Sequence, residues 1–274
     1  MDLTAVREVV DGRDVLPWQP GDAWLAGGTV LFAEPRPGLR RLRDLGTWRW
    51  EPLTATEDGL EVAATCTIAE LLTYAEAPYG PWPTGRALIS GCCRAFSSSF
   101  KVWNTATVGG NLCTALPVGS VISLAVALRG VCRMSGLDGR RREVPAEQFV
   151  TGSGTTVLLP GELLRSVWLP ATALAERSTV RRVSTHPWGR SVALVTGTHE
   201  PGAGRLTVAV TAATTRPVTV SFSRAPAATE LRRALEEALT PDLLLQDAHG
   251  RADWRRHLAL HLAEEVRGEL AGRG

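Results

Sequence analysis

The sequence predicts an α+β protein in two parts, a larger one over residues 1–170 and a smaller one over residues 171–274. Short strand-like and helix-like segments alternate as far as Pro170. After a linker-like stretch over 171–177, four strand-like segments are followed by two helices. A chain of 274 residues is long enough for two modest domains, each with its own apolar core.

The first part is expected to begin with short strands. A strand that ends in a glycine turn is expected over 23–32, and alternation of apolar and charged residues predicts half-exposed strands over 39–45 and 60–64. Thr67 and Glu70 form a capping box, which opens a helix through Ala75. The other expected elements are helices over 86–96 and 119–128 and strands over 131–134, 156–159 and 164–169.

The second part is expected to be a small antiparallel sheet covered by helices. Its strands are expected over 180–184, 191–198, 206–213 and 218–222, and its helices over 229–239 and 254–270. The last helix places Trp254, Leu258, Leu262 and Val266 on one face at a spacing of four.

Charge, cysteine spacing and hydropathy exclude several classes of function. The formal net charge is +2 with Arg, Asp and Glu intermixed, which argues against binding of nucleic acid. The five cysteines include no C-x-x-C pair, so neither an iron-sulfur cluster nor a zinc site is expected. The odd cysteine count and the lack of a leader-like pattern favour a cytoplasmic protein, and no apolar run reaches the length of a membrane span.

Other catalytic and metal-binding patterns are also missing. His257 and His261 have the i, i+4 spacing of a metal pair, but no H-E-x-x-H motif accompanies them, and we expect solvated or capping histidines. Gly152-Ser-Gly154 lacks the G-x-S-x-G pattern of a hydrolase. We therefore predict no catalytic residue and no metal ligand on this chain.

Two Gly-Gly pairs, Gly27-Gly28 and Gly109-Gly110, are the most informative feature. Each lies between strand-like apolar residues and beside a hydroxyl residue. Successive backbone N–H groups in a glycine turn bind anions, so two converging turns would hold a pyrophosphate. Neither pair belongs to a G-x-G-x-x-G or Walker A motif. An isolated pair is more often an ordinary tight turn, and the surrounding strings decide between the two interpretations.

Three strings occur in the order and spacing of a known family: Leu25-Ala-Gly-Gly-Thr29, Ala106-Thr-Val-Gly-Gly-Asn-Leu112 and Leu158-Leu-Pro-Gly-Glu-Leu-Leu164. Over residues 24–170 the chain resembles the FAD-binding subunit of molybdenum hydroxylases of the xanthine dehydrogenase and carbon monoxide dehydrogenase type. The resemblance implies a two-part FAD-binding domain like that of vanillyl-alcohol oxidase, followed by a small α+β domain. It also implies that FAD is the cofactor.

The resemblance also implies which residues contact FAD. The first glycine loop would wrap the pyrophosphate, the second would contact pyrophosphate and flavin, and Leu158 would pack near the isoalloxazine, with a basic residue around Arg182 near the flavin or nucleotide. The implied residues are Leu25, Ala26, Gly27, Gly28, Thr29, Val30, Ala106, Thr107, Gly109, Gly110, Asn111, Thr114, Ser120, Leu158 and Arg182. Covalent attachment to Cys113 is the less favoured alternative to noncovalent FAD.

The chain departs from the family pattern at four positions. The family usually has Ser before Pro117 and Asp three residues after it, where this chain has Leu116 and Ser120. Val30 replaces a commonly polar residue, and Trp103 stands where an Arg is common. The missing carboxylate removes an expected acceptor for the hydroxyl groups of the cofactor, so altered FAD affinity or orientation is expected.

The function implied is electron transfer within a complex. Electrons would come from [2Fe-2S] clusters on one partner subunit, substrate would be oxidised at molybdopterin on another, and NAD, dioxygen or a quinone would be the acceptor. Two alternatives stay open. One is a self-contained flavin oxidoreductase, and the other is a flavin-free assembly subunit, which Leu116 and Ser120 motivate.

Overall fold

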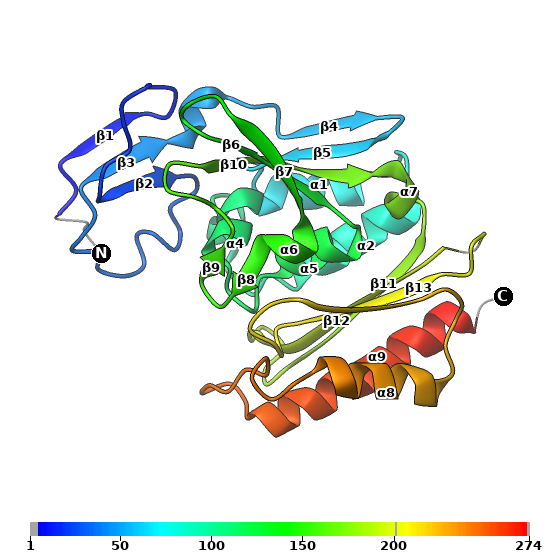
Figure 1. Cartoon of the computed structure of the whole chain (residues 1–274). Helices are drawn as coiled ribbons and strands as arrows, with labels where there is room; N and C mark the ends of the chain where they lie inside the picture. The colour runs from blue at the N-terminus through cyan, green and yellow to red at the C-terminus, as the bar shows by residue number, and fades with distance from the viewer. Residues whose placement is uncertain (1–4, 201, 273–274) are drawn as a thin grey trace.

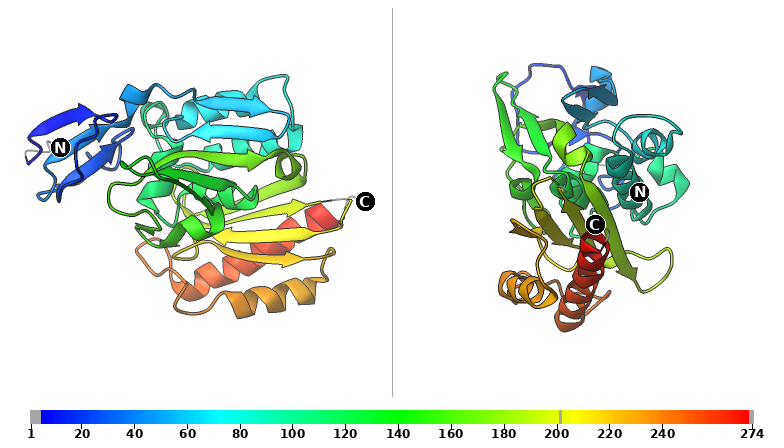
Figure 2. Two further views of the ribbon diagram at one scale, coloured as in Figure 1. Left: turned by 45° about the horizontal axis from the view of Figure 1, so that its top comes forward. Right: turned by 90° about the vertical axis from the view of Figure 1, so that its right-hand side faces the viewer.

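The first strands form a small lobe beside the main body of the molecule. The computed structural model describes residues 5–200 and 202–272, and within them residues 5–48 make up this first lobe (Figure 1). Its strands β1 (Glu8–Asp11), β2 (Asp22–Leu25) and β3 (Arg41–Asp44) form a parallel sheet in the order β1-β3-β2. The 3-10 helix η1 (Leu45–Trp48) follows. Figure 2 shows the lobe standing to one side of the larger sheets.

The first lobe has a charged interior, which corrects one expectation. Arg41, Leu42 and Arg43 in β3 are all buried, so the half-exposed strand expected over 39–45 is wrong. The strand expected to be half-exposed over 60–64 is also buried, except for Glu61. Asp22 Oδ2 lies 2.7 Å from Arg41 Nη2 and 3.2 Å from Arg43 Nε. The guanidinium of Arg43 also lies 5.8 Å from the ring centroid of Trp18. Alternating Arg and Leu is typical of a half-exposed strand, but here the buried carboxylate of Asp22 pairs with the arginines.

The main body begins with a five-stranded sheet whose inner face is covered by helices. The strands, in the order β4-β5-β10-β6-β7, are β4 (Leu53–Thr56), β5 (Gly59–Ala63), β10 (Leu163–Pro170), β6 (Val131–Ser135) and β7 (Arg141–Pro145). The helices are α1 (Ile68–Glu76), α2 (Pro83–Arg94), α3 (Phe100–Trp103), α4 (Val108–Thr114), α5 (Ser120–Ala127) and α6 (Ala146–Phe149). The hairpin of β8 (Val150–Gly152) and β9 (Thr155–Thr156) and the short helix α7 (Ala171–Leu174) complete this part. The predicted capping box of α1 is confirmed, with Thr67 and Glu70 bonded reciprocally.

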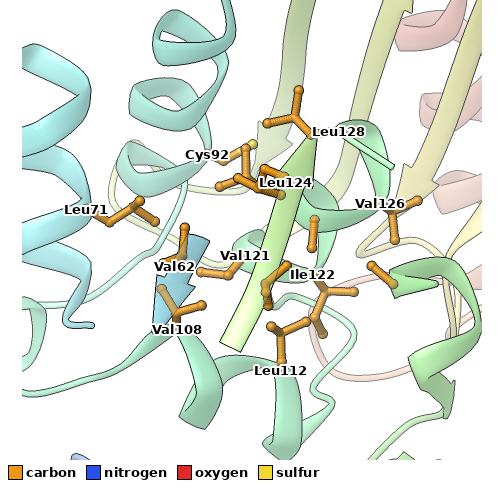
Figure 3. Packing of buried hydrophobic residues seen from close by; sticks show 14 of the residues in the cluster. Val62, Leu71, Cys92, Val108, Leu112, Val121, Ile122, Leu124, Val126 and Leu128 are labelled. Carbon is orange, nitrogen blue, oxygen red and sulfur yellow. The ribbon is translucent and has the colours of Figure 1, made fainter. Parts of the chain in front are cut away.

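Helix α5 lies between the five-stranded sheet and the four-stranded sheet of the C-terminal part. All eight residues of Ser120–Ala127 are buried, and Figure 3 shows Val121, Ile122 and Leu124 packed among side chains of β5, α2 and α4. The other side of α5 contacts the second large sheet, where Ser123 Oγ lies 2.6 Å from Thr211 Oγ1. A helix that is apolar on all sides is expected to be covered on all sides, and α5 meets that expectation.

The C-terminal part follows the sequence prediction closely. Strands β11 (Arg177–Ser184), β12 (Ser191–His199), β13 (Leu206–Thr211) and β14 (Val218–Phe222) form an antiparallel sheet in chain order. Helices α8 (Ala228–Ala238) and α9 (Ala252–Ala271) cover its outer face (Figure 1). No helix in the described residues is both long and apolar enough to cross a membrane.

Several first-part elements differ from the prediction. Helix α2 begins at Pro83, one turn earlier than expected, and the strand expected over 156–159 overlaps β9 (Thr155–Thr156) only at Thr156. The expected linker contains α7, whose Ala173 and Leu174 are fully buried in the main core. Strands β1, β4 and β7 were not predicted because each is short and half-exposed, so the apolar alternation is weak.

Candidate functional site

The two glycine segments lie close together in space. The first follows β2 in the lobe, and the second contains the start of α4 in the main body. A Cβ atom placed on Gly27 would lie 1.8 Å from the backbone oxygen of Thr105 and 3.3 Å from Cα of Ala106. Real Cβ atoms essentially never come within 3.0 Å of another atom, so only glycine permits this approach. The contact fixes the first loop against the residues that precede α4.

The first loop presents free backbone donors. Gly28 has φ of +68°, a left-handed conformation that favours glycine, and its carbonyl accepts the N–H of Phe32 at 2.8 Å. Within the described residues, the N–H groups of residues 27–31 donate to no protein acceptor. A run of unpaired N–H groups in a turn is an anion-binding arrangement. Leu25 ends β2, and residues 26–31 form the loop that carries these donors.

The second segment is a helix start, and the glycine turn expected there is wrong. Thr107 caps α4, and its Oγ1 accepts the N–H of Gly110 at 3.0 Å. The N–H of Val108 donates to Cys66, that of Gly109 to Ala64 and that of Asn111 to Thr107, at 2.8 to 2.9 Å. These four N–H groups are therefore already bonded to protein and are not available to a ligand, whereas the N–H of Thr107 donates to no acceptor within the described residues.

Two buried oxygen atoms near α4 and α5 have no hydrogen-bond partner. They are Asn111 Oδ1 and Ser120 Oγ, and Ser120 is completely buried. A Cβ placed on Gly119 would lie 2.9 Å from Asn111 Oδ1, which puts this oxygen beside the start of α5. A buried polar atom without a partner costs about 1 to 3 kcal/mol. Such atoms are expected where a ligand with hydroxyl or amide groups completes the bonding.

The remaining implied residues differ in how closely they join this site. Thr114 Oγ1 donates to the carbonyl of Gly110 at 2.6 Å and stabilises α4. Leu158 follows the β8–β9 hairpin, whose Gly154 N–H donates to Ala115 at the end of α4. Leu158 is thus near the second segment, half-buried against the main core.

Arg182 lies elsewhere in the chain, in β11. Its Nη2 donates to Ser184 Oγ at 3.0 Å and to the carbonyl of Gly189 at 2.9 Å. Burial lowers the pKa of Arg182. No described contact joins it to either glycine segment, so its role stays a prediction.

The structure does not favour flavin attachment at Cys113 or metal binding at His261. Burial raises the pKa of the Cys113 thiol to about 12, so the thiol is protonated and is a poor nucleophile for flavin attachment. His261 is exposed and lies 3.3 Å from Glu265. Among the described residues, no group of three His, Cys, Asp or Glu side chains could hold a metal ion.

The sequence analysis missed the features that hold the two segments in place. The Asp22 pairs with Arg41 and Arg43 tie β2, and hence the first loop, to β3. The cap of α4 was missed because glycine stands at the third helical position, where Glu or Gln completes a capping box. The signal available was Thr107 itself, a preferred N-cap residue.

Comparison with known proteins places the chain in a family. Residues 24–172 match the model of the FAD binding domain in molybdopterin dehydrogenase, more than half of the chain, and the protein belongs to that family. It is 30% identical over 126 residues to xanthine dehydrogenase 1 of Arabidopsis thaliana, covering 44% of this chain. The chain spans about 9% of the length of that relative.

Two solved structures have the same fold over nearly their whole chains. A chain of quinoline 2-oxidoreductase from Pseudomonas putida 86 has a TM-score of 0.78 at 20% identity, with 99% of each chain covered. A chain of CO dehydrogenase from Oligotropha carboxidovorans has a TM-score of 0.81 at 18% identity, with both chains fully covered. The expected fold, a two-part FAD-binding domain followed by a small α+β domain, is confirmed.

Proposed function

We propose that this chain is the FAD-binding electron-transfer subunit of a molybdenum hydroxylase. The observation that carries the proposal is the contact between Gly27 and Thr105, which joins the free donors of residues 27–31 to the α4 segment. The match to the FAD-binding family over residues 24–172 identifies the ligand that this arrangement would take. When bound, FAD supplies a centre that accepts electrons singly and delivers them in pairs.

Each group of residues then has a distinct role. The N–H groups of residues 27–31 would bind the pyrophosphate, since they are unpaired and successive. Asn111 Oδ1 and Ser120 Oγ would bond the hydroxyl groups of the cofactor, because both oxygens are buried without a partner. Leu158 would pack near the isoalloxazine, and Arg182 would lie near the flavin or nucleotide.

The family match supports the proposed partners. The chain matches only 9% of a curated xanthine dehydrogenase but all of one chain of a solved CO dehydrogenase, which supports a division of the work among chains. A [2Fe-2S] subunit would supply electrons to this chain, and a molybdopterin subunit would oxidise the substrate. The acceptor would be NAD, dioxygen or a quinone.

Affinity purification of the tagged chain from its native cell tests this proposal. Iron, molybdenum and flavin should be recovered with it. Tagged Gly27→Ala is the matched variant, which should recover iron and molybdenum with little flavin. A yellow, metal-free protein that oxidises a substrate alone would favour the self-contained oxidoreductase. A colourless protein that does not take up FAD but brings the metal subunits with it would favour the assembly subunit.

A further inference from the structure

A groove separate from the glycine segments lies between the first lobe and the five-stranded sheet. Its volume is about 600 Å³. The lobe contributes residues 12–15, Trp24 and Trp48, and the sheet contributes Trp50, Arg165 and the β6–β7 hairpin. No residue of segments 26–30 or 106–114 lines it. The groove is therefore distinct from the site at the contact between Gly27 and Thr105, and its ligand must be inferred from its own residues.

Arg165 is a cation in this groove without a hydrogen-bond acceptor. Its guanidinium carbon lies 4.2 Å from the ring centroid of Trp50, and its Nη1 is buried with no partner. Burial lowers the pKa of Arg165, the nearby carboxylate of Glu61 opposes this shift, and the charge of Arg141 adds to it. The nearby carboxylate of Glu61 is already engaged, since its Oε1 accepts from Ser166 at 2.6 Å and from Arg133 at 3.5 Å. Within the described residues, the guanidinium of Arg165 therefore makes no hydrogen bond to a carboxylate.

Arg141 is a second cation without an acidic partner. Its side chain makes no ion pair or hydrogen bond within the described residues and lines the same groove. The neighbouring arginines are neutralised, Arg133 by Glu143 at 3.0 Å and Arg142 by Glu162 at 2.6 Å. Among the arginines that line the groove, Arg141 and Arg165 are therefore the two without an ion pair in the described residues, and the carboxylate of Asp14 also lines the groove.

An aromatic wall stands beside these cations. The ring centroids of Trp48 and Trp50 lie 5.4 Å apart with an angle of 41° between the ring planes, and Trp48 is 39% exposed. Arginine pairs bind phosphate and carboxylate through directed, charge-assisted hydrogen bonds, and tryptophan binds planar rings by stacking. A volume of 600 Å³ lies within the range of small-molecule sites.

We propose that this groove binds a nucleoside monophosphate, with its phosphate at Arg141 and Arg165 and its base against Trp48. This ligand is additional to the FAD role proposed above. The adenosine phosphate half of FAD carries the same chemistry, so two sources exist for one ligand type. Binding of AMP to protein that is already saturated with FAD identifies a separate nucleotide.

Calorimetric titration of the FAD-saturated protein with AMP tests the proposal. AMP should bind with an affinity that falls as salt rises, and adenosine or inorganic phosphate alone should bind at least about tenfold more weakly. Arg141→Gln and Arg165→Gln should each weaken AMP binding by about tenfold, because each removes a charged hydrogen-bond donor. Arg140→Gln is the matched control, since Arg140 is exposed, pairs with Asp138 at 3.2 Å and does not line the groove.

Three results would overturn this inference. AMP that binds only flavin-free protein and is displaced by FAD would assign the groove to the adenosine end of FAD. AMP affinity unchanged in the double variant Arg141→Gln/Arg165→Gln would place the nucleotide elsewhere. Absence of AMP binding to the FAD-saturated protein would exclude the site. Flavin uptake, measured by absorbance on the same samples, separates these outcomes from failure of the FAD assignment, and thermal unfolding confirms that each variant is folded.

Discussion

Substitution of Gly27 by alanine should loosen the junction of the two glycine segments and release FAD. The added Cβ would lie 1.8 Å from Thr105 oxygen, so the first loop must move until this distance reaches at least 3.0 Å, a shift of about 1.2 Å. A hydrogen bond of 2.9 Å stretched by this amount is no longer a hydrogen bond. The N–H groups of residues 27–31 would move relative to α4, and bonds to the pyrophosphate would be lost.

The size of the effect follows from the number of bonds lost. Each hydrogen bond to a charged group contributes about 1.5 to 3 kcal/mol, and loss of two at the lower value is about 3 kcal/mol. This corresponds to FAD binding about 100-fold weaker. Flavin fluorescence quenching on apoprotein gives the dissociation constant, and the ratio of flavin to protein absorbance gives the occupancy after purification.

Gly38→Ala is the matched control, since Gly38 lies in the same lobe and a Cβ there would meet nothing within 4 Å. It should bind FAD like the unmodified protein. Circular dichroism and thermal unfolding of both apoproteins show whether Gly27→Ala has kept its fold. A folded Gly27→Ala protein with unchanged FAD affinity would refute the assignment of this junction as the pyrophosphate site.

Three further predictions concern the site and its support. Gly110→Val should lower flavin content while circular dichroism stays native-like, because a side chain there meets only Thr107 Oγ1 and would fill ligand space; full flavin content would count against the loop. Asp22→Asn should destabilise the fold by about 3 kcal/mol in urea unfolding, since it leaves the buried Arg43 without a carboxylate and Arg41 with only Glu8 at 3.7 Å. Burial alone would raise the pKa of Asp22, but hydrogen bonds from Arg41 and Arg43 lower it overall. The stabilisation that the Asp22 carboxylate gives the fold is therefore present above the ordinary pKa of Asp and is lost as the pH falls towards the folded-state pKa. A pH-independent difference in stability between the unmodified protein and Asp22→Asn would contradict this. Acid precipitation should release the flavin, and flavin in the pellet would refute noncovalent binding.

Local patterns were sufficient for the C-terminal part of the fold. Strands β11 to β14 are neighbours in both sequence and space, and α9 packs one apolar face against them. Leu262 and Val266, predicted on that face, are buried, while Trp254 is 38% exposed. In such an arrangement the period of apolar residues reports burial directly. The same reasoning predicted the fully buried α5, whose sequence is apolar on every side.

The first lobe could not be predicted in this way because its contacts are distant in sequence and charged. β1 pairs with β3 more than thirty residues later, with Glu8 opposite Arg41. Arg43 is completely buried, which no apolar pattern indicates. The second glycine segment was predicted as a turn because glycine disfavours helices. A Cβ added to Gly109 would lie only 2.5 Å from the Cβ of Ala64, so the packing of α4 requires glycine at this position. Tertiary packing therefore overrode local preference at α4.

Replacement of the usual carboxylate by Ser120 lowers the free-energy cost of an unpaired buried group in the apoprotein. A buried carboxylate at this position would be costly without a partner, because an unpaired buried charge loses several kcal/mol of solvation. A buried hydroxyl without a partner costs only about 1 to 3 kcal/mol. Ser120 is completely buried and unpaired, and the fold nevertheless packs around it. This chain therefore depends less on FAD for its stability than one with Asp at this position, and it gives up the stronger hydrogen bond that a carboxylate would make to the cofactor.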